Sequence, residues 1–294
     1  QGNTDNTASN IEHQLQSLDG NDKKRIRMAW ADVDEVIDRI RQLLLYTGDS
    51  PVVHYTSIKV GDIMVMQPKF KLRYSNVVFM NDPEEGNAFL DYLSDSQLAS
   101  SIERAEKKDD NNIYLGSFLP EDKKDYLIMW RTYGKNELNE DATGCSFLIQ
   151  STFFDRDSTS LYAVKKENSS QELPSTDLLH SQSLYKVVYF DRELNQIIMD
   201  SETDQKKLIT EIRTFKQKIN DLLKIRDENV NNQVEPKNNI IDGLVYRFIS
   251  ELRYFFKSAE YQFEKELRVI KYYPMESKMV LTEKETNQLP RKLY

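Results

Sequence analysis

Cysteine and histidine are scarce in this sequence of 294 residues, and their scarcity excludes several kinds of site. The single cysteine, Cys145, cannot form an intramolecular disulfide, and its apolar neighbours indicate a small buried side chain rather than a reactive thiol. A reducing compartment is therefore expected. The three histidines, His13, His54 and His180, lie far apart in the chain and predict no dense metal site.

Long apolar runs are absent as well. No stretch reaches the roughly 18 apolar residues that a membrane-spanning helix needs, and 30% of the residues are charged. The first 25 residues are polar and do not resemble a conventional signal peptide. We expect a protein without a membrane partner, located in the cytoplasm or delivered into a host cytosol by a specialised secretion system.

The sequence has no excess of basic residues, the feature that favours nucleic-acid binding. The chain has 40 Lys and Arg against 48 Asp and Glu, a formal net charge of −8. An acidic surface repels phosphate backbones, so nucleic acid is an unfavoured partner. The basic clusters at 23–27 and 206–207 have acidic neighbours and are typical of solvated helix faces.

The familiar short catalytic signatures are not present. The sequence contains no glycine-rich phosphate loop, no His-Glu-x-x-His, no paired Cys/His metal spacing and no Gly-x-Ser-x-Gly. A P-loop NTPase, a zinc protease with a His-Glu-x-x-His motif and an α/β-hydrolase are thereby excluded. We expect no metal cofactor.

The sequence does contain enough apolar residues for a substantial core, 39% of the chain. Apolar spacing of three and four predicts helices at 27–47, 204–229 and 239–257, the last two forming a helical hairpin. Shorter helices are predicted at 58–66 and 84–94. Strands are predicted at 52–55, 70–80, 113–118, 145–153, 160–165, 184–190 and 266–273.

These elements predict an α+β fold and four regions along the chain. Residues 1–22 are polar and predict a mobile tail, and 23–50 an N-terminal helix. Residues 51–275 form the expected main domain, with the helical hairpin 204–257 inserted late. Residues 276–294 form a C-terminal tail.

Four clusters of chemically capable residues occur in a fixed order along the main domain. The first is His54-Tyr55-Thr56, which follows an apolar strand. The second cluster is Leu72-Arg73-Tyr74-Ser75 together with Asn81-Asp82-Pro83-Glu84-Glu85. The third is Ser117-Phe118 together with Trp130-Arg131-Thr132-Tyr133-Gly134 and the strand that Gly144 begins. The fourth is Glu264-Lys265-Glu266-Leu267-Arg268.

This order resembles a large, mostly uncharacterised bacterial family related to ADP-ribosyltransferases, over about residues 52–273. Its members show H-Y-T, L-R-x-S, N-D-P-x-E, S-F, W-x-x-Y-G, a glycine-led strand and E-x-E-x-R. The resemblance implies two small, mostly antiparallel sheets that form a split core, with an NAD cleft between them. The polar composition and the late hairpin also resemble secreted bacterial effectors or toxins.

The chemistry of NAD cleavage explains the residue types. Breaking the nicotinamide–ribose bond gives an oxocarbenium-like transition state, which a nearby carboxylate stabilises. The resemblance assigns Glu266 to this role. The spacing of Glu264 and Glu266 allows the pair to serve as base and ribose anchor together, and Glu137, on the charged loop between Gly134 and Gly144, is a rival carboxylate. Glu264 and Glu266 are expected on one strand face, two residues apart.

The resemblance assigns NAD binding to the remaining candidates. His54 would hold a ribose, and Tyr55 or Tyr133 would pack on the nicotinamide. Thr56, Arg73, Ser75, Asn81, Asp82 and Trp130 complete the expected binding residues. The chain combines the His-Tyr start of the diphtheria-toxin-like group with the Glu-x-Glu pair typical of arginine modifiers.

Structural readings of the same residues stay open. His54 is also typical of a strand end, Asn81-Asp82-Pro83 of a helix cap, and Trp130 and Tyr133 of a core. The expected function is transfer of ADP-ribose from NAD to a protein side chain, with arginine as the first acceptor considered. An arginine acceptor needs a base because its guanidinium is always charged in water, and Glu264 or Glu137 could supply that base. The alternatives are an NAD glycohydrolase and a non-catalytic nucleotide- or partner-binding module.

Overall fold

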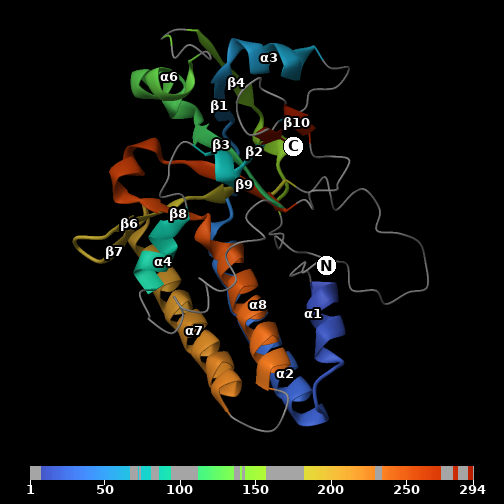
Figure 1. Ribbon diagram of the computed structural model, residues 1–294. Coiled ribbons are helices and arrows are strands. Elements are labelled where there is room, and N and C mark those ends of the chain that lie inside the picture. Colours follow the sequence, from blue (N-terminus) through green and yellow to red (C-terminus); the bar gives the residue numbers. More distant parts are fainter. Residues whose placement is uncertain are drawn as a thin grey trace.

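The chain is arranged as a helical layer and a sheet layer (Figure 1). The computed structural model describes residues 8–66, 72, 74–80, 86–93, 112–135, 140, 143–156, 182–228, 234–272, 281–283 and 291–293. None of their helices is long and apolar enough to span a membrane.

The helical layer consists of α1 (Ala8–Leu15), α2 (Gly20–Leu44), α7 (Glu202–Asp227) and α8 (Val234–Arg253). The Asp19 side chain caps α2 by accepting the backbone N–H groups of Asn21 and Asp22, each at 2.9 Å. The hydroxyl of Ser201 caps α7 in the same way. Both caps satisfy amide groups that a helix start leaves without partners.

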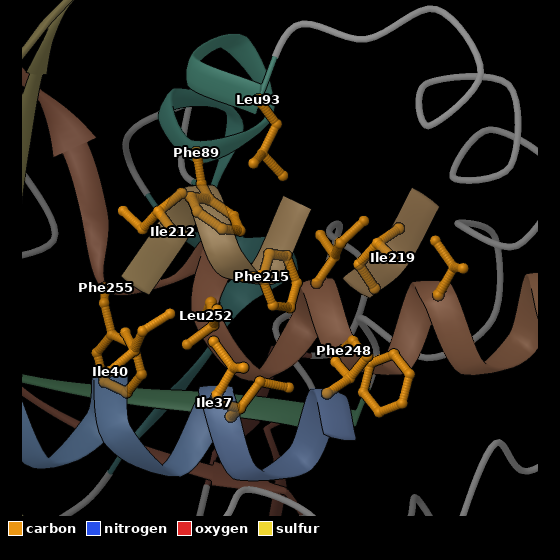
Figure 2. Packing of buried hydrophobic residues seen from close by; sticks show 14 of the residues in the cluster. Ile37, Ile40, Phe89, Leu93, Ile212, Phe215, Ile219, Phe248, Leu252 and Phe255 are labelled. Carbon is orange, nitrogen blue, oxygen red and sulfur yellow. The ribbon is translucent and has the colours of Figure 1, made fainter. Parts of the chain in front are cut away.

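The apolar faces of these helices meet in one large core, seen from close by in Figure 2. Ile37 and Ile40 of α2 face Phe215 of α7, and the short helix α4 (Asn87–Leu93) closes one side. Phe89 of α4 stacks on Phe256 with ring centroids 4.6 Å apart. The spacing of three and four that predicted the long helices is thus explained by burial on this core.

A buried arginine joins the helical layer to the sheet layer. Arg41 of α2 lies 3.1 Å from Glu251 of α8, and both side chains are almost fully buried. A second Arg41 nitrogen donates to the hydroxyl of Tyr185 at 3.0 Å. Because Tyr185 belongs to a strand of the main sheet, this one guanidinium fixes three elements.

The main sheet has β1 (Val52–Ser57) and β3 (Ile113–Pro120) at its centre. Its path runs β10, β11, β2, β3, β1, β4, and β9 pairs with β3 and β5, all antiparallel. The remaining strands are β2 (Ser75–Asn76), β4 (Gly144–Ile149), β5 (Tyr185–Lys186), β9 (Leu267–Tyr272), β10 (Leu281–Glu283) and β11 (Arg291–Leu293).

Strand β1 pairs with β3 over two residues and then leaves it. The register joins Val52 to Pro120 and Val53 to Leu119, whereas β1 stays paired with β4 along its whole length. The rest of β3 pairs with β9. The β1–β4 pair therefore diverges from the β3–β9 pair beyond Val53.

A second, smaller sheet contains β6 (Val188–Asp191), β7 (Gln196–Ile198) and β8 (Phe256–Ser258). Strand β6 pairs antiparallel with β7 and parallel with β8. Within the described residues the strands thus form two sheets. The expected α+β class, with two mostly antiparallel sheets and flanking helices, is confirmed at this level.

Several sequence-based boundaries differ from the structure. Part of the expected tail 1–22 forms α1, because Ile11 and Leu15 are buried in the helical core. Part of the expected tail 276–294 forms β10 and β11, which extend the main sheet. The predicted strand at 160–165 lies outside the described residues.

Two further elements are shorter than expected. Within the described residues of the predicted strand 70–80, which are 72 and 74–80, the structure has the two-residue strand β2 and a 3₁₀ turn, η1 (Val77–Phe79), whose start the Asn76 side chain caps. The helix predicted to reach residue 257 ends at Arg253, because Phe256 joins the small sheet.

Phe215 offers a test of the helical core. Replacing Phe215 with Ala removes a fully buried ring from the centre of α7, and we expect a loss of about 3–5 kcal/mol in the free energy of unfolding. Urea unfolding followed by circular dichroism measures this loss. Met28→Ala, at an exposed position of α2, is the control and should change stability by less than about 0.5 kcal/mol. Equal stabilities of the two variants would contradict this packing.

Candidate functional site

The two glutamates of the E-x-E pattern come together, but not on one strand. Glu264 is the last residue of a 3₁₀ helix, η6 (Ala259–Glu264), and Glu266 directly precedes β9. Lys265 between them has a left-handed backbone with φ of 50°. The expected strand geometry is therefore wrong, because this residue turns the chain between the two carboxylates.

One lysine bridges the pair. The ammonium of Lys257, from β8, donates to Glu264 Oε2 at 2.7 Å and to Glu266 Oε2 at 3.1 Å. The same nitrogen lies 4.5 Å from the centre of the Tyr261 ring. All three ion-paired side chains are buried, with no more than 5% of each exposed.

Arg268 holds Glu266 from the other side. Its Nε donates to Glu266 Oε1 at 2.8 Å and its Nη2 to Oε2 at 3.1 Å, a two-pronged contact. Its Nη1 donates to the carbonyl oxygen of Tyr254 at 2.7 Å. The backbone N–H of Glu266 donates to the hydroxyl of Tyr189 at 2.8 Å, which links the cluster to β6.

Tyr133 completes the arrangement from α6 (Leu127–Tyr133). Its hydroxyl donates to Glu264 Oε1 at 3.0 Å. We call Tyr133, Lys257, Glu264, Glu266 and Arg268 the glutamate cluster. Its members come from α6, η6, β8 and the start of β9, so the site exists only in the folded chain.

The two carboxyl groups differ in their electrostatics. Burial, together with the nearby charge of Glu266, raises the pKa of Glu264 above its ordinary value. Burial acts in the same direction on Glu266, but Arg268 and Lys257 outweigh it and hold the pKa of Glu266 far below the usual range. The cluster therefore contains one firmly ionised carboxylate and one that binds a proton more readily.

Tyr55 and Trp130 serve packing in this structure. The Tyr55 ring meets Trp130 edge to face, with centroids 4.9 Å apart at 89°. Its hydroxyl donates to the backbone carbonyls of Lys123 and Lys124, both at 2.7 Å. Tyr55 also belongs to a small apolar cluster with Met129. These contacts fix α6, and therefore Tyr133, against β1.

His54 lies where β1 leaves β3. Its Nδ1 is 2.9 Å from the carbonyl oxygen of Ser117, and its ring packs beside Phe118 at 5.4 Å between centroids. Burial lowers the pKa of His54, so the ring is neutral at pH 7. In that form Nδ1–H donates to Ser117 and Nε2 remains an acceptor.

Strand alternation separates His54 from the glutamate cluster. Val52 and Phe118 share one apolar cluster, while Val53 and Tyr55 belong to another on the opposite face. His54 lies on the Phe118 side. In β9, Arg268 lies between Leu267 and Val269, which both belong to the cluster that contains Phe118. The side chain of Arg268 therefore points to the opposite face of the sheet, the Tyr55 side. Ser117 joins the two faces, since its carbonyl binds His54 and its hydroxyl binds Glu266.

The other predicted residues lie apart from the cluster or outside the described chain. Thr56 pairs with Cys145 across β1 and β4, and Ser75 pairs with Leu115 across β2 and β3. Four predicted residues lie outside the described residues: Arg73, Asn81, Asp82 and Glu137.

Sequence reasoning missed Lys257. It follows two phenylalanines in a segment read as the end of a helix, and a lysine there is typical of a solvated position. The available signal was a charged residue directly after an apolar run. Only the small sheet explains why this lysine points inward.

The described part of the chain holds no group of three or more His, Cys, Asp or Glu residues suited to a metal ion. Comparison of the sequence with family models and curated proteins, and with solved structures, gives no match. The chemistry of the site therefore has to be argued from its own residues.

Tyr133→Phe tests the contact with Glu264. Removing the hydroxyl leaves a buried carboxyl oxygen short of a donor, and we expect a loss of about 1–3 kcal/mol in the free energy of unfolding at pH 7. Denaturant unfolding gives the value. Tyr126→Phe, at the exposed start of the same helix, is the matched control and should be neutral. If the two variants are equally stable, the Tyr133 hydroxyl does not bind Glu264.

Proposed function

We propose that this chain cleaves NAD at the nicotinamide–ribose bond and transfers ADP-ribose to a protein side chain, with arginine as the first acceptor to test. One observation carries the proposal: two buried glutamates separated by one residue converge with Tyr133 in a single cluster. The reaction needs a carboxylate beside the ribose and a second group that exchanges a proton. Glu264 and Glu266 differ in proton affinity, so the pair can supply both the carboxylate and the group that exchanges a proton.

The strand arrangement supports the same proposal. An ADP-ribosyltransferase-like fold has a split β-core, and here β1 and β4 diverge from β3 and β9 after two paired residues. The E-x-E pattern lies beside this divergence, at the start of β9. The candidate carboxylates therefore lie near the feature that the proposed fold requires.

The hydrogen bonds favour Glu264 as the carboxylate that contacts the reacting ribose. A carboxylate offers about four acceptor positions. Glu266 uses its positions for Arg268, Lys257 and Ser117, and two cations offset its charge. Glu264 binds Tyr133 and Lys257, which leaves positions for a ribose hydroxyl. This reverses the expectation from the sequence, which gave Glu266 the ribose.

His54 stands outside this proposal. A ribose bound to Glu264 on the Tyr55 side of the sheet does not meet a ring on the Phe118 side without movement of β1. The β1–β3 pairing ends at Val53, and the neutral imidazole of His54 hydrogen-bonds the carbonyl oxygen of Ser117 directly beyond that point. This contact accounts for His54 without a bound nucleotide.

Hydrolysis of NAD is a second candidate, and the burial of the cluster favours it. Glu264 and Glu266 are 2% and 4% exposed, so the ribose of NAD reaches them only after rearrangement in either reaction. Water then needs less space beside the ribose than an arginine side chain does. In this reading the chain is an NAD glycohydrolase, and no protein acceptor is labelled.

Glutamine variants test the proposal through nicotinamide release, measured with and without an arginine-rich acceptor protein. We expect Glu264→Gln to lower both hydrolysis and transfer about 100-fold or more, a transition-state cost of about 2.7 kcal/mol. Glu137→Gln should leave hydrolysis intact and lower transfer if that loop meets the acceptor. Glu266→Gln should lose stability as well as activity, because Arg268 then lacks its anion and Lys257 keeps only Glu264.

The control is Glu260→Gln, an exposed glutamate in the same 3₁₀ helix. It should keep full activity. Normal rates in a folded Glu264→Gln variant would remove Glu264 from the chemistry. Absence of nicotinamide release by the unaltered chain would reject both reactions, and calorimetric titration with NAD would then show whether a non-catalytic nucleotide-binding module remains.

A further inference from the structure

Lys257 lies at the junction of the two sheets. It belongs to β8 of the small sheet, whereas its partner Glu266 leads into β9 of the main sheet (Figure 1). Its side chain is 5% exposed. A buried lysine normally loses its charge, but the neighbouring Glu266 and Glu264 outweigh the burial and raise the pKa of Lys257. The ammonium is therefore a fixed charge within the cluster.

The two cations of the cluster divide unequally between the two glutamates. Arg268 binds both oxygens of Glu266, whereas Lys257 gives one hydrogen bond to each carboxyl group. Without Lys257, Glu266 would keep its two-pronged guanidinium partner. Glu264 would keep the hydroxyl of Tyr133, a neutral donor. Lys257 is thus the cation on which the charge of Glu264 depends.

The groups that face Glu264 come from every element packed around it. They are Tyr133 of α6, Tyr189 of β6, Lys257 of β8, Glu266 before β9, and Arg268 of β9. Tyr133 and Tyr189 remain protonated, because burial and the adjacent glutamates raise the pKa of both phenols. Among these groups, Glu264 therefore takes up a proton most readily as the pH falls.

We propose that Lys257 is a positioning residue that controls the protonation of Glu264: Arg268 holds Glu266 as an anion, and Lys257 keeps Glu264 ionised beside it. Two carboxylates that share one donor repel each other, and without a cation one of them takes up a proton. The catalytic meaning of this inference rests on the proposed function. The distribution of the proton does not depend on it.

The pH dependence of nicotinamide release tests the inference. Lys257→Met should shift the acid limb of the profile upward by about 1–3 pH units, because Glu264 then loses its proton only at higher pH. Lys257→Arg should restore most of the original profile, since it returns the charge. Lys224→Met, at an exposed lysine of α7, is the matched control and should not shift the limb.

Two further variants keep the test decisive if Lys257→Met does not fold. Lys257→Gln keeps a hydrogen-bond donor without the charge and should shift the acid limb in the same direction. In a Glu264→Gln background, Lys257→Met should lower the remaining rate by less than about threefold, because the lysine acts through Glu264. An unchanged acid limb in Lys257→Gln, or a full additional loss in the double variant, overturns the inference.

A titration without turnover separates this inference from the proposed function. Carbon NMR of ¹³C-labelled glutamate side chains follows the ionisation of Glu264, whose signal is identified by its absence in Glu264→Gln. Lys257→Gln should move the midpoint of that signal upward by about 1–3 pH units. If the unaltered chain releases no nicotinamide but this shift occurs, the proposed function fails and the role of Lys257 in charge distribution stands. If the midpoint does not move, the inference fails whatever the activity.

Discussion

The ammonium of Lys257, held between two buried carboxylates, is the contact around which the site is organised. A buried charge is tolerated only when it is paired and hydrogen-bonded, so each partner has to occupy a defined place. Here Lys257 comes from the small sheet, its partners come from η6 and from the residue that precedes β9 of the main sheet, and Tyr133 adds a helix. The same requirement explains why Arg268 is fully buried and still bonded to Glu266 and to a backbone carbonyl. The relative placement of these elements is therefore a consequence of charge balance as well as of apolar packing.

The helical layer was the most predictable part of the fold. Apolar residues spaced by three and four predicted α2, α7 and the body of α8, and these residues do face one core. The strands β1, β3 and β9 were predicted from short apolar runs. What failed were elements whose stability comes from distant partners. Helix α1 depends on burial of Ile11 and Leu15, and β11 depends on pairing with β2 and β10.

The candidate site was predictable in its residue types but not in its geometry. The E-x-E pattern predicts Glu264 and Glu266 as candidate carboxylates, and the resemblance gives Tyr133 as a residue that packs on the nicotinamide. The sequence could not show that His54 and the glutamates face opposite sides of the sheet, because that depends on how β1, β3 and β9 are aligned. It also could not identify Lys257, since a single lysine carries no local signal until the partners that surround it are known.

The left-handed backbone at Lys265 gives the E-x-E pattern a meaning that its letters do not convey. In an extended strand the middle residue is free to be β-branched, and valine or isoleucine would be the natural choice. At a φ of 50° such residues are strained, whereas glycine and asparagine fit well and an unbranched lysine is tolerated. Two chains can therefore share both glutamates and differ in how they present them. The middle residue, which has no part in the chemistry, distinguishes a pair presented by a turn from a pair presented by a strand.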